Sequence, residues 1–103
     1  MAQWQRVAVL KDVKNDAQTF RVVVNGTALC LFDLGDEICA TQDICPHGNA
    51  SLSEGFVENG TVECPLHQGV FDIKSGKPLC PPVETDLALY EVKQDGEDIL
   101  VRI

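Results

Sequence analysis

The chain has 103 residues, of which 45% are hydrophobic and 23% are charged, which is the composition of a single globular domain. Sixteen acidic residues face eight basic ones, so the formal net charge is −8. Nucleic acids and anionic membranes both attract basic surfaces, so this charge argues against either as a partner. No apolar run is long enough for a signal peptide or a membrane span, and we expect a cytoplasmic protein.

Basic and acidic residues are unevenly distributed along the chain. All eight Lys and Arg lie outside residues 22–73, while this stretch contains half of the acids: Asp33, Asp36, Glu37, Asp43, Glu54, Glu58, Glu63 and Asp72. The rest of the chain is balanced, so the whole excess of −8 lies in this stretch. On composition alone, the simplest interpretation is that the excess keeps the protein soluble.

Strand and turn signals alternate along the chain. Asn25-Gly26 separates two apolar runs, residues 20–24 and 28–32, which is a strong hairpin signal. Only residues 50–55 suggest one helical turn, and further turns are expected at residues 34–36, 59–60, 75–76 and 95–96. We therefore expect an all-β domain of about eight or nine short strands, arranged as a small antiparallel sandwich or barrel.

Residues 44–72 differ in character from the rest of the chain. They contain both histidines, two Cys-Pro pairs and four glycines. We expect a loop-rich insert here, carried by a base that comprises residues 1–43 and 73–103 of the same domain. Elsewhere, Cys30, Cys39 and Cys80 are expected to be structural, and Trp4 to anchor the core.

Two short motifs pair a cysteine with a histidine. Cys45-Pro46-His47 and Cys64-Pro65-Leu66-His67 are separated by sixteen residues, and each proline restricts the backbone of its loop. Chance combined with core packing explains this poorly, because the chain has only two histidines and both lie within three residues of a Cys-Pro cysteine. A structural zinc site is possible in principle, but zinc fingers usually pair Cys with Cys and His with His. The third alternative is a [2Fe–2S] centre in which two histidines hold one iron and two cysteines hold the other.

The chain as a whole resembles the Rieske-type ferredoxins of bacterial aromatic-ring-hydroxylating dioxygenase systems, especially the naphthalene-dioxygenase type. The resemblance is carried by the segments Cys45-Pro46-His47-Gly48, Cys64-Pro65-Leu66-His67-Gln68-Gly69 and Gly76-Lys77-Pro78-Leu79-Cys80-Pro81-Pro82-Val83. It implies the Rieske fold, in which a β-sheet base carries a smaller cluster-binding subdomain, residues 44–72 here.

The resemblance also implies one [2Fe–2S] cluster and its ligands. Cys45 and Cys64 would hold the inner iron, and His47 and His67 the outer iron near the surface. The residues expected around the cluster beyond these ligands are Gly48, Leu66, Gln68, Gly69 and Pro81.

Departures from high-potential relatives affect the expected redox potential. Ala50 and Leu66 occupy the positions where those relatives carry a disulfide, and Gly69 and Phe71 the positions where they place hydroxyl groups on the cluster sulfurs. With fewer hydrogen bonds to the reduced cluster, we expect a potential at the low end of the Rieske range, about −150 mV.

The function implied by the resemblance is one-electron transfer from a flavin-containing reductase to a terminal oxygenase, by a monomer that is not itself an enzyme. Catalysis by a separate iron would need further histidines, and no G-x-G-x-x-G nucleotide motif is present. The alternatives are the Rieske-like small subunit of an assimilatory nitrite reductase and a structural zinc module. Partner docking is expected around His47 and His67, steered by the neighbouring acids Asp43, Glu54, Glu63 and Asp72.

Overall fold

The computed structural model describes residues 3–46, 48–66, 69–80 and 85–103. Nearly all regular structure in these residues is β, which confirms the expected fold class. The elements are β1 (Trp4–Val9), α1 (Leu10–Val13), β2 (Thr19–Val24), β3 (Thr27–Asp33), β4 (Ile38–Gln42), the 3-10 turn η1 (Leu52–Glu54), β5 (Phe56–Glu58), β6 (Thr61–Glu63), β7 (Val70–Asp72), β8 (Leu89–Tyr90), β9 (Val92–Asp95) and β10 (Asp98–Arg102).

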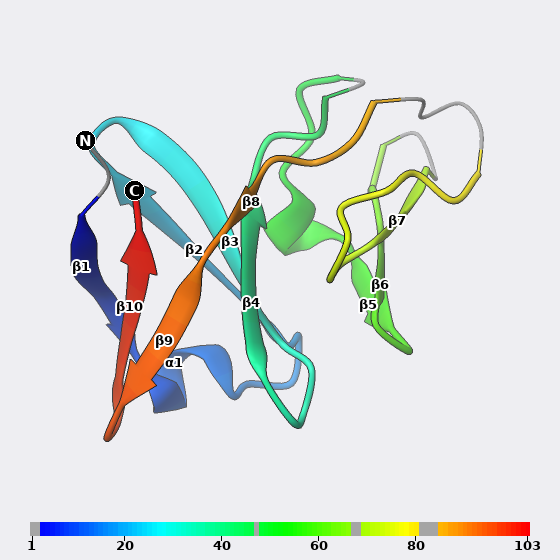
Figure 1. Ribbon diagram of the computed structural model, residues 1–103. Coiled ribbons are helices and arrows are strands. Elements are labelled where there is room, and N and C mark those ends of the chain that lie inside the picture. The colour runs from blue at the N-terminus through cyan, green and yellow to red at the C-terminus, as the bar shows by residue number, and fades with distance from the viewer. Residues whose placement is uncertain (1–2, 47, 67–68, 81–84) are drawn as a thin grey trace.

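The described strands form three antiparallel sheets (Figure 1). Two of them, with the strand orders β1-β10-β9 and β2-β3-β4-β8, belong to the N- and C-terminal parts of the chain. The third, β5-β6-β7, comes from the middle of the chain and lies to one side of the other two (Figure 1).

The first core lies between the β1-β10-β9 sheet and the β2-β3-β4-β8 sheet. Leu29 and Leu31 of β3 pack there with Ile99 and Val101 of β10, and all four side chains are fully buried. Because side chains alternate along a strand, these leucines leave Cys30 and Phe32 on the opposite face of β3.

Cys30 and Phe32 enter a second core beneath the third sheet. There they join Val62 of β6 and Phe71 of β7, so β3 is buried on both faces. This explains the continuous apolar run at residues 28–32, which is the pattern of a strand covered on both sides. The third sheet therefore shares its core with the base and does not form one of its own.

Two hairpins have the turn geometry expected from their Asn-Gly pairs. Asn25 and Gly26 have φ of 51° and 79° between β2 and β3, and Asn59 and Gly60 have φ of 51° and 77° between β5 and β6. Positive φ at both central positions defines the tight turn that matches the twist of paired strands, and Asn and Gly tolerate it best.

Two details differ from the sequence expectations. Helix α1 was not predicted; it is a single turn whose first residues are held by a hydrogen bond from the Val9 N–H to the Asp12 carboxylate, 3.2 Å long. Trp4 does not anchor the core: 38% of it is exposed, and the Lys93 ammonium lies 4.7 Å from its ring centre.

Within the described part of the chain, no helix has the length and hydrophobicity needed to cross a membrane.

Candidate metal centre

The loop after β4 carries the first cysteine of the expected ligand set. Its ends are held together by the isolated bridge between Ile44 and Ser51. Inside the loop, the Cys45 N–H donates to the Ala50 carbonyl at 2.9 Å, and the Gly48 N–H donates to the Cys45 carbonyl at 3.2 Å. Cys45 is almost completely buried, so this short loop turns its thiol into the protein.

The β6–β7 hairpin carries the second cysteine. The pairing of Glu63 with Val70 closes the loop, and the Cys64 N–H donates to the Gly69 carbonyl at 2.8 Å. Cys64 is fully buried, whereas Leu66, two residues further on, is 66% exposed. The loop therefore presents its cysteine inward and Leu66 outward.

Both cysteines belong to one buried cluster, which also contains Ala50, Leu52 and Phe71. No disulfide joins any of the five cysteines. Two buried thiols from two tight loops, surrounded by apolar side chains, suit a soft metal or an iron–sulfur cluster, for which thiolates are the preferred protein ligands.

The other half of the expected ligand set is not among the described residues. His47 and His67, and with them Gln68 and Pro81, lie outside the described residues. Among residues 3–46, 48–66, 69–80 and 85–103, no three Cys, His, Asp or Glu side chains form a group that could hold a metal ion. The ligand set of Cys45, His47, Cys64 and His67 thus stays a prediction. Its two cysteines lie in a buried apolar cluster, which suits an iron–sulfur centre.

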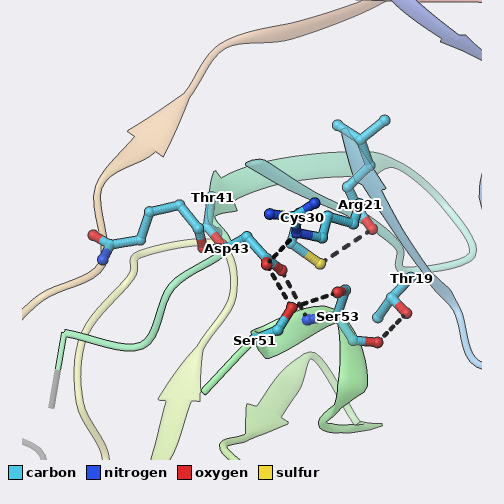
Figure 2. Close-up of polar contacts among 9 residues, drawn as sticks. Thr19, Arg21, Cys30, Thr41, Asp43, Ser51 and Ser53 are labelled. Atoms are coloured by element: carbon cyan, nitrogen blue, oxygen red, sulfur yellow. Dashed lines mark hydrogen bonds and ion pairs between the residues drawn. The ribbon is translucent and has the colours of Figure 1, made fainter. Parts of the chain in front are cut away.

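A buried carboxylate anchors the first loop (Figure 2). Asp43 is fully buried and accepts hydrogen bonds from the Ser51 hydroxyl and from the Ser53 N–H, the latter at 3.0 Å. Its third partner is Arg21 on β2, whose Nε lies 3.0 Å from the carboxylate. These contacts hold both ends of the Cys45 loop to the base.

Asp43 was expected to steer partner docking, and the structure corrects this. Asp43 has no exposed surface for a docking protein to contact, and its ion pair with Arg21 offsets the charge that would steer one. The anchoring role was missed because sequence spacing gives no sign of Arg21, which lies twenty-two positions away in the chain. Of the other expected docking acids, Glu54 is exposed, and Glu63 and Asp72 are partly buried.

Gly55 lets the start of β5 pack closely against the backbone that leads into the Cys64 loop. A Cβ atom at this position would collide with the carbonyl oxygen of Glu63, the residue immediately before Cys64. Only glycine lets the two backbones come this close. The close approach ties the η1–β5 corner to the end of β6 from which the Cys64 loop begins.

A third segment runs alongside β7 towards the same region. Pro78 forms a bridge with Phe71, and the Leu79 N–H donates to the Val70 carbonyl at 2.7 Å. Cys80, which follows, is partly buried. In the sequence, this segment leads directly to Pro81, one of the residues that the resemblance places around the cluster.

The two remaining cysteines behave as structural thiols. Burial, followed by the nearby Asp43 carboxylate, raises the pKa of Cys30 far above its usual range. Burial and then Glu37 raise the pKa of Cys39 to about 11. Both thiols are therefore kept protonated near neutral pH, as expected for packing residues.

Comparison with known proteins shows the family. Residues 3–91 match the Rieske [2Fe-2S] domain family. The chain is 40% identical to the anthranilate 1,2-dioxygenase ferredoxin subunit of Burkholderia cepacia, covering 94% of this chain and 90% of that protein. It is 39% identical to the ferredoxin component of the naphthalene 1,2-dioxygenase/salicylate 5-hydroxylase systems of a Ralstonia species, covering 97% and 95%.

A solved structure agrees with these sequence matches. It is the complex of reduced oxygenase and oxidized ferredoxin in carbazole 1,9a-dioxygenase, in which the matching chain has a TM-score of 0.87 and 34% identity, covering 95% of this chain and 91% of that one. The fold, the buried cysteine pair and the sequence matches agree, and the chain belongs to the Rieske [2Fe-2S] domain family.

Proposed function

We propose that this protein is a one-electron carrier that takes electrons from a flavin-containing reductase and passes them to a terminal aromatic-ring-hydroxylating oxygenase. The observation that carries the proposal is the pair of buried cysteines, Cys45 and Cys64, which two separate loops bring into one apolar cluster. The sequence relatives of this protein are ferredoxin components of dioxygenase systems, which supports the same role. We expect a cytoplasmic monomer, with residues 44–72 as its cluster-binding subdomain.

In this proposal, Cys45 and Cys64 hold one iron, and His47 and His67 hold the other. A cluster with this ligand set supplies reversible one-electron chemistry when bound. The protein contributes rigidity and exclusion of water. Asp43 fixes the first loop, and the apolar side chains around the two thiols keep water away from them.

Replacing single ligands tests the assignment. Cys45→Ser and His67→Ala should each lose the visible absorbance and the EPR signal of the reduced protein, together with most of the bound iron and sulfide. Cys39→Ser is the matched control, since Cys39 lies outside the two motifs and should leave all of these signals unchanged. A ligand variant that keeps the native EPR signal contradicts the assignment, and a colourless wild-type protein that contains zinc refutes the whole proposal.

The partner distinguishes the carrier role from that of a nitrite reductase subunit. The reduced protein is mixed with the oxygenase and, separately, with the nitrite reductase of the same host, and reoxidation is followed in a stopped-flow instrument. Rapid transfer to the oxygenase alone supports the proposal. Transfer only to the nitrite reductase contradicts it.

The low expected potential can be tested at two positions. Phe71 is fully buried in the same cluster as Cys45 and Cys64, and its side chain offers no hydrogen bond there. Gly69→Ser combined with Phe71→Tyr supplies two hydroxyl groups, which should stabilise the reduced state and raise the potential in voltammetry. An unchanged potential argues against this explanation of the expected low potential.

A further inference from the structure

Apart from the expected docking acids Glu63 and Asp72, the outward face of the third sheet has no role in anything described so far. Directly opposite residues on antiparallel strands share a face, and the register pairs Phe56 with Glu63 and Glu63 with Val70. The next row towards the Asn59-Gly60 turn pairs Glu58 with Thr61 and Thr61 with Asp72. The opposite side of the sheet carries the core residues Val57, Val62 and Phe71.

The segment that follows β7 extends this face. The Leu79 N–H donates to the Val70 carbonyl, and the Asp72 N–H donates to the Lys77 carbonyl at 2.9 Å. Leu79 therefore continues the row of Phe56, Glu63 and Val70, and Lys77 continues the other row. We call the residues of these two rows the sheet-3 face: Phe56, Glu58, Thr61, Glu63, Val70, Asp72, Lys77 and Leu79.

The sheet-3 face exposes large apolar side chains. Phe56 is 68% exposed, the highest value among the large hydrophobic residues of the described chain, and Leu79 is 54% exposed. Beside Phe56 lies an open hollow of about 300 Å³ that Glu58, Thr61, Glu63 and Val70 also line. An aromatic ring at the edge of a hollow, with further apolar side chains in the same row, is typical of a protein-binding surface.

The charges of this face indicate the kind of partner. Glu58, Glu63 and Asp72 are acidic, and Lys77 offsets one of them. A second copy of this chain would bring the same acids against each other, which disfavours self-association through this face. A protein that carries Lys or Arg around an apolar patch would complement it.

The position of the face connects it to electron transfer. Glu63 directly precedes Cys64, and Val70 directly follows Gly69, so the row that contains Phe56, Glu63, Val70 and Leu79 lies at the end of the sheet from which the Cys64 loop extends. A protein seated on this row would lie beside that loop. The ferredoxin of the carbazole system, which shares this fold, has been solved in complex with its oxygenase.

From these observations we propose that the sheet-3 face docks the oxygenase, with Phe56 and Leu79 in apolar contact and the acids facing basic side chains of the partner. This inference rests on the proposed carrier function. It adds Phe56, Glu58, Val70 and Leu79 to the docking residues expected from sequence.

Two variants of the cluster-loaded protein test the proposal, each with a matched control in the base. Phe56→Ala removes the aromatic contact, and Val23→Ala truncates another exposed apolar residue, on β2. Glu58→Lys reverses an acidic charge on the face, and Glu97→Lys reverses an exposed one between β9 and β10. The readout is the second-order rate constant for reduction of the oxygenase by the pre-reduced carrier, with absorbance and EPR spectra as checks on the cluster.

We expect Phe56→Ala to lower this rate constant about tenfold, the effect of losing a central aromatic contact. Glu58→Lys should lower the rate constant at low salt and weaken its salt dependence, while both controls behave as wild type. Equal rates for Phe56→Ala and Val23→Ala, with unchanged Glu58→Lys kinetics, overturn the proposal, as does an effect confined to transfer from the reductase. A wild-type dimer that Phe56→Ala converts to a monomer also overturns it. A wild-type protein that transfers no electrons to the oxygenase refutes the proposed function instead.

Discussion

Replacing Asp43 with alanine removes the carboxylate that fixes the Cys45 loop to the base. The side chain is fully buried and accepts hydrogen bonds from Ser51, Ser53 and Arg21. A hydrogen bond to a charged group contributes about 1.5–3 kcal/mol, but the Arg21 side chain is 49% exposed, so solvent weakens that pair. Since contacts to one carboxylate are not additive, we expect a total loss of about 3–5 kcal/mol in the free energy of unfolding.

The chain offers a matched control on its surface. Arg6 and Asp98 form the same kind of ion pair, with the arginine Nε 2.9 Å from the carboxylate, but their side chains are 62% and 46% exposed. Asp98→Ala should therefore cost less than about 1 kcal/mol. Residue types and distance are nearly the same in both pairs, so the difference between the two variants measures burial together with the hydrogen bonds that Asp43 accepts from Ser51 and Ser53.

The measurement is urea unfolding of the cluster-loaded proteins, followed by circular dichroism and by visible absorbance. Asp43→Ala should shift both transitions to lower urea and should lose absorbance first, because its loop carries a proposed ligand. Arg21→Met leaves Ser51 and Ser53 in place, so we expect it to cost about 1–2 kcal/mol, more than Arg6→Met. If Asp43→Ala is no less stable than Asp98→Ala, the anchoring role is wrong.

Four further predictions concern other parts of the molecule. Gly55→Ala should destabilise the protein by about 1–3 kcal/mol in urea unfolding, because the new methyl group meets the carbonyl of Glu63, whereas Gly35→Ala fills open space and costs only backbone strain. At pH 8, Cys39 should react with iodoacetamide about a hundredfold more slowly than a free cysteine, since its pKa of about 11 lies above the ordinary value of 9.0, and Glu37→Gln should speed this reaction. Because the folded protein disfavours the Cys39 thiolate, its raised pKa adds to the free energy of unfolding below pH 9, and this contribution is lost as pH rises through 11. A free energy of unfolding that stays constant over this pH range contradicts the prediction. Electron transfer to the oxygenase should slow as ionic strength rises, and a rate that is equal at low and high salt would exclude electrostatic steering.

Local chemistry made much of the fold predictable. Asn25-Gly26 and Asn59-Gly60 each mark a hairpin because few other residue pairs tolerate positive φ at both positions. The apolar run at 28–32 marked a strand, and η1 lies within the residues expected to form a helical turn. These features depend on neighbours in the chain, so one sequence is enough to find them.

Features that depend on distant partners could not be found this way. Asp43 looks like any acid beside a loop until the fold brings Arg21 to it. Phe56 and Val57 are adjacent apolar residues, and only the packing of the third sheet decides that Val57 faces the core and Phe56 faces solvent. The motifs predict Cys45 and Cys64 as the cysteine half of a metal site because those residues carry specific chemistry, and this assignment stays a prediction. The packing of these cysteines with Phe71 and Leu52 emerged only from the structure.

The ion pairs also change the interpretation of the acidic stretch at residues 22–73. Basic residues from outside the stretch neutralise its first part: Lys14 pairs with Asp33 at 3.1 Å, Arg21 with Asp43 at 3.0 Å, and Lys74 with Glu37 at 2.7 Å. Among the described residues, none of the ion pairs involves the later acids, Glu54, Glu58, Glu63 and Asp72. The negative charge available to a partner is thus concentrated on and beside the third sheet, whereas the composition alone had assigned it to the whole middle of the chain. Glu63→Gln should therefore reduce the salt dependence of electron transfer, and Asp33→Asn should not.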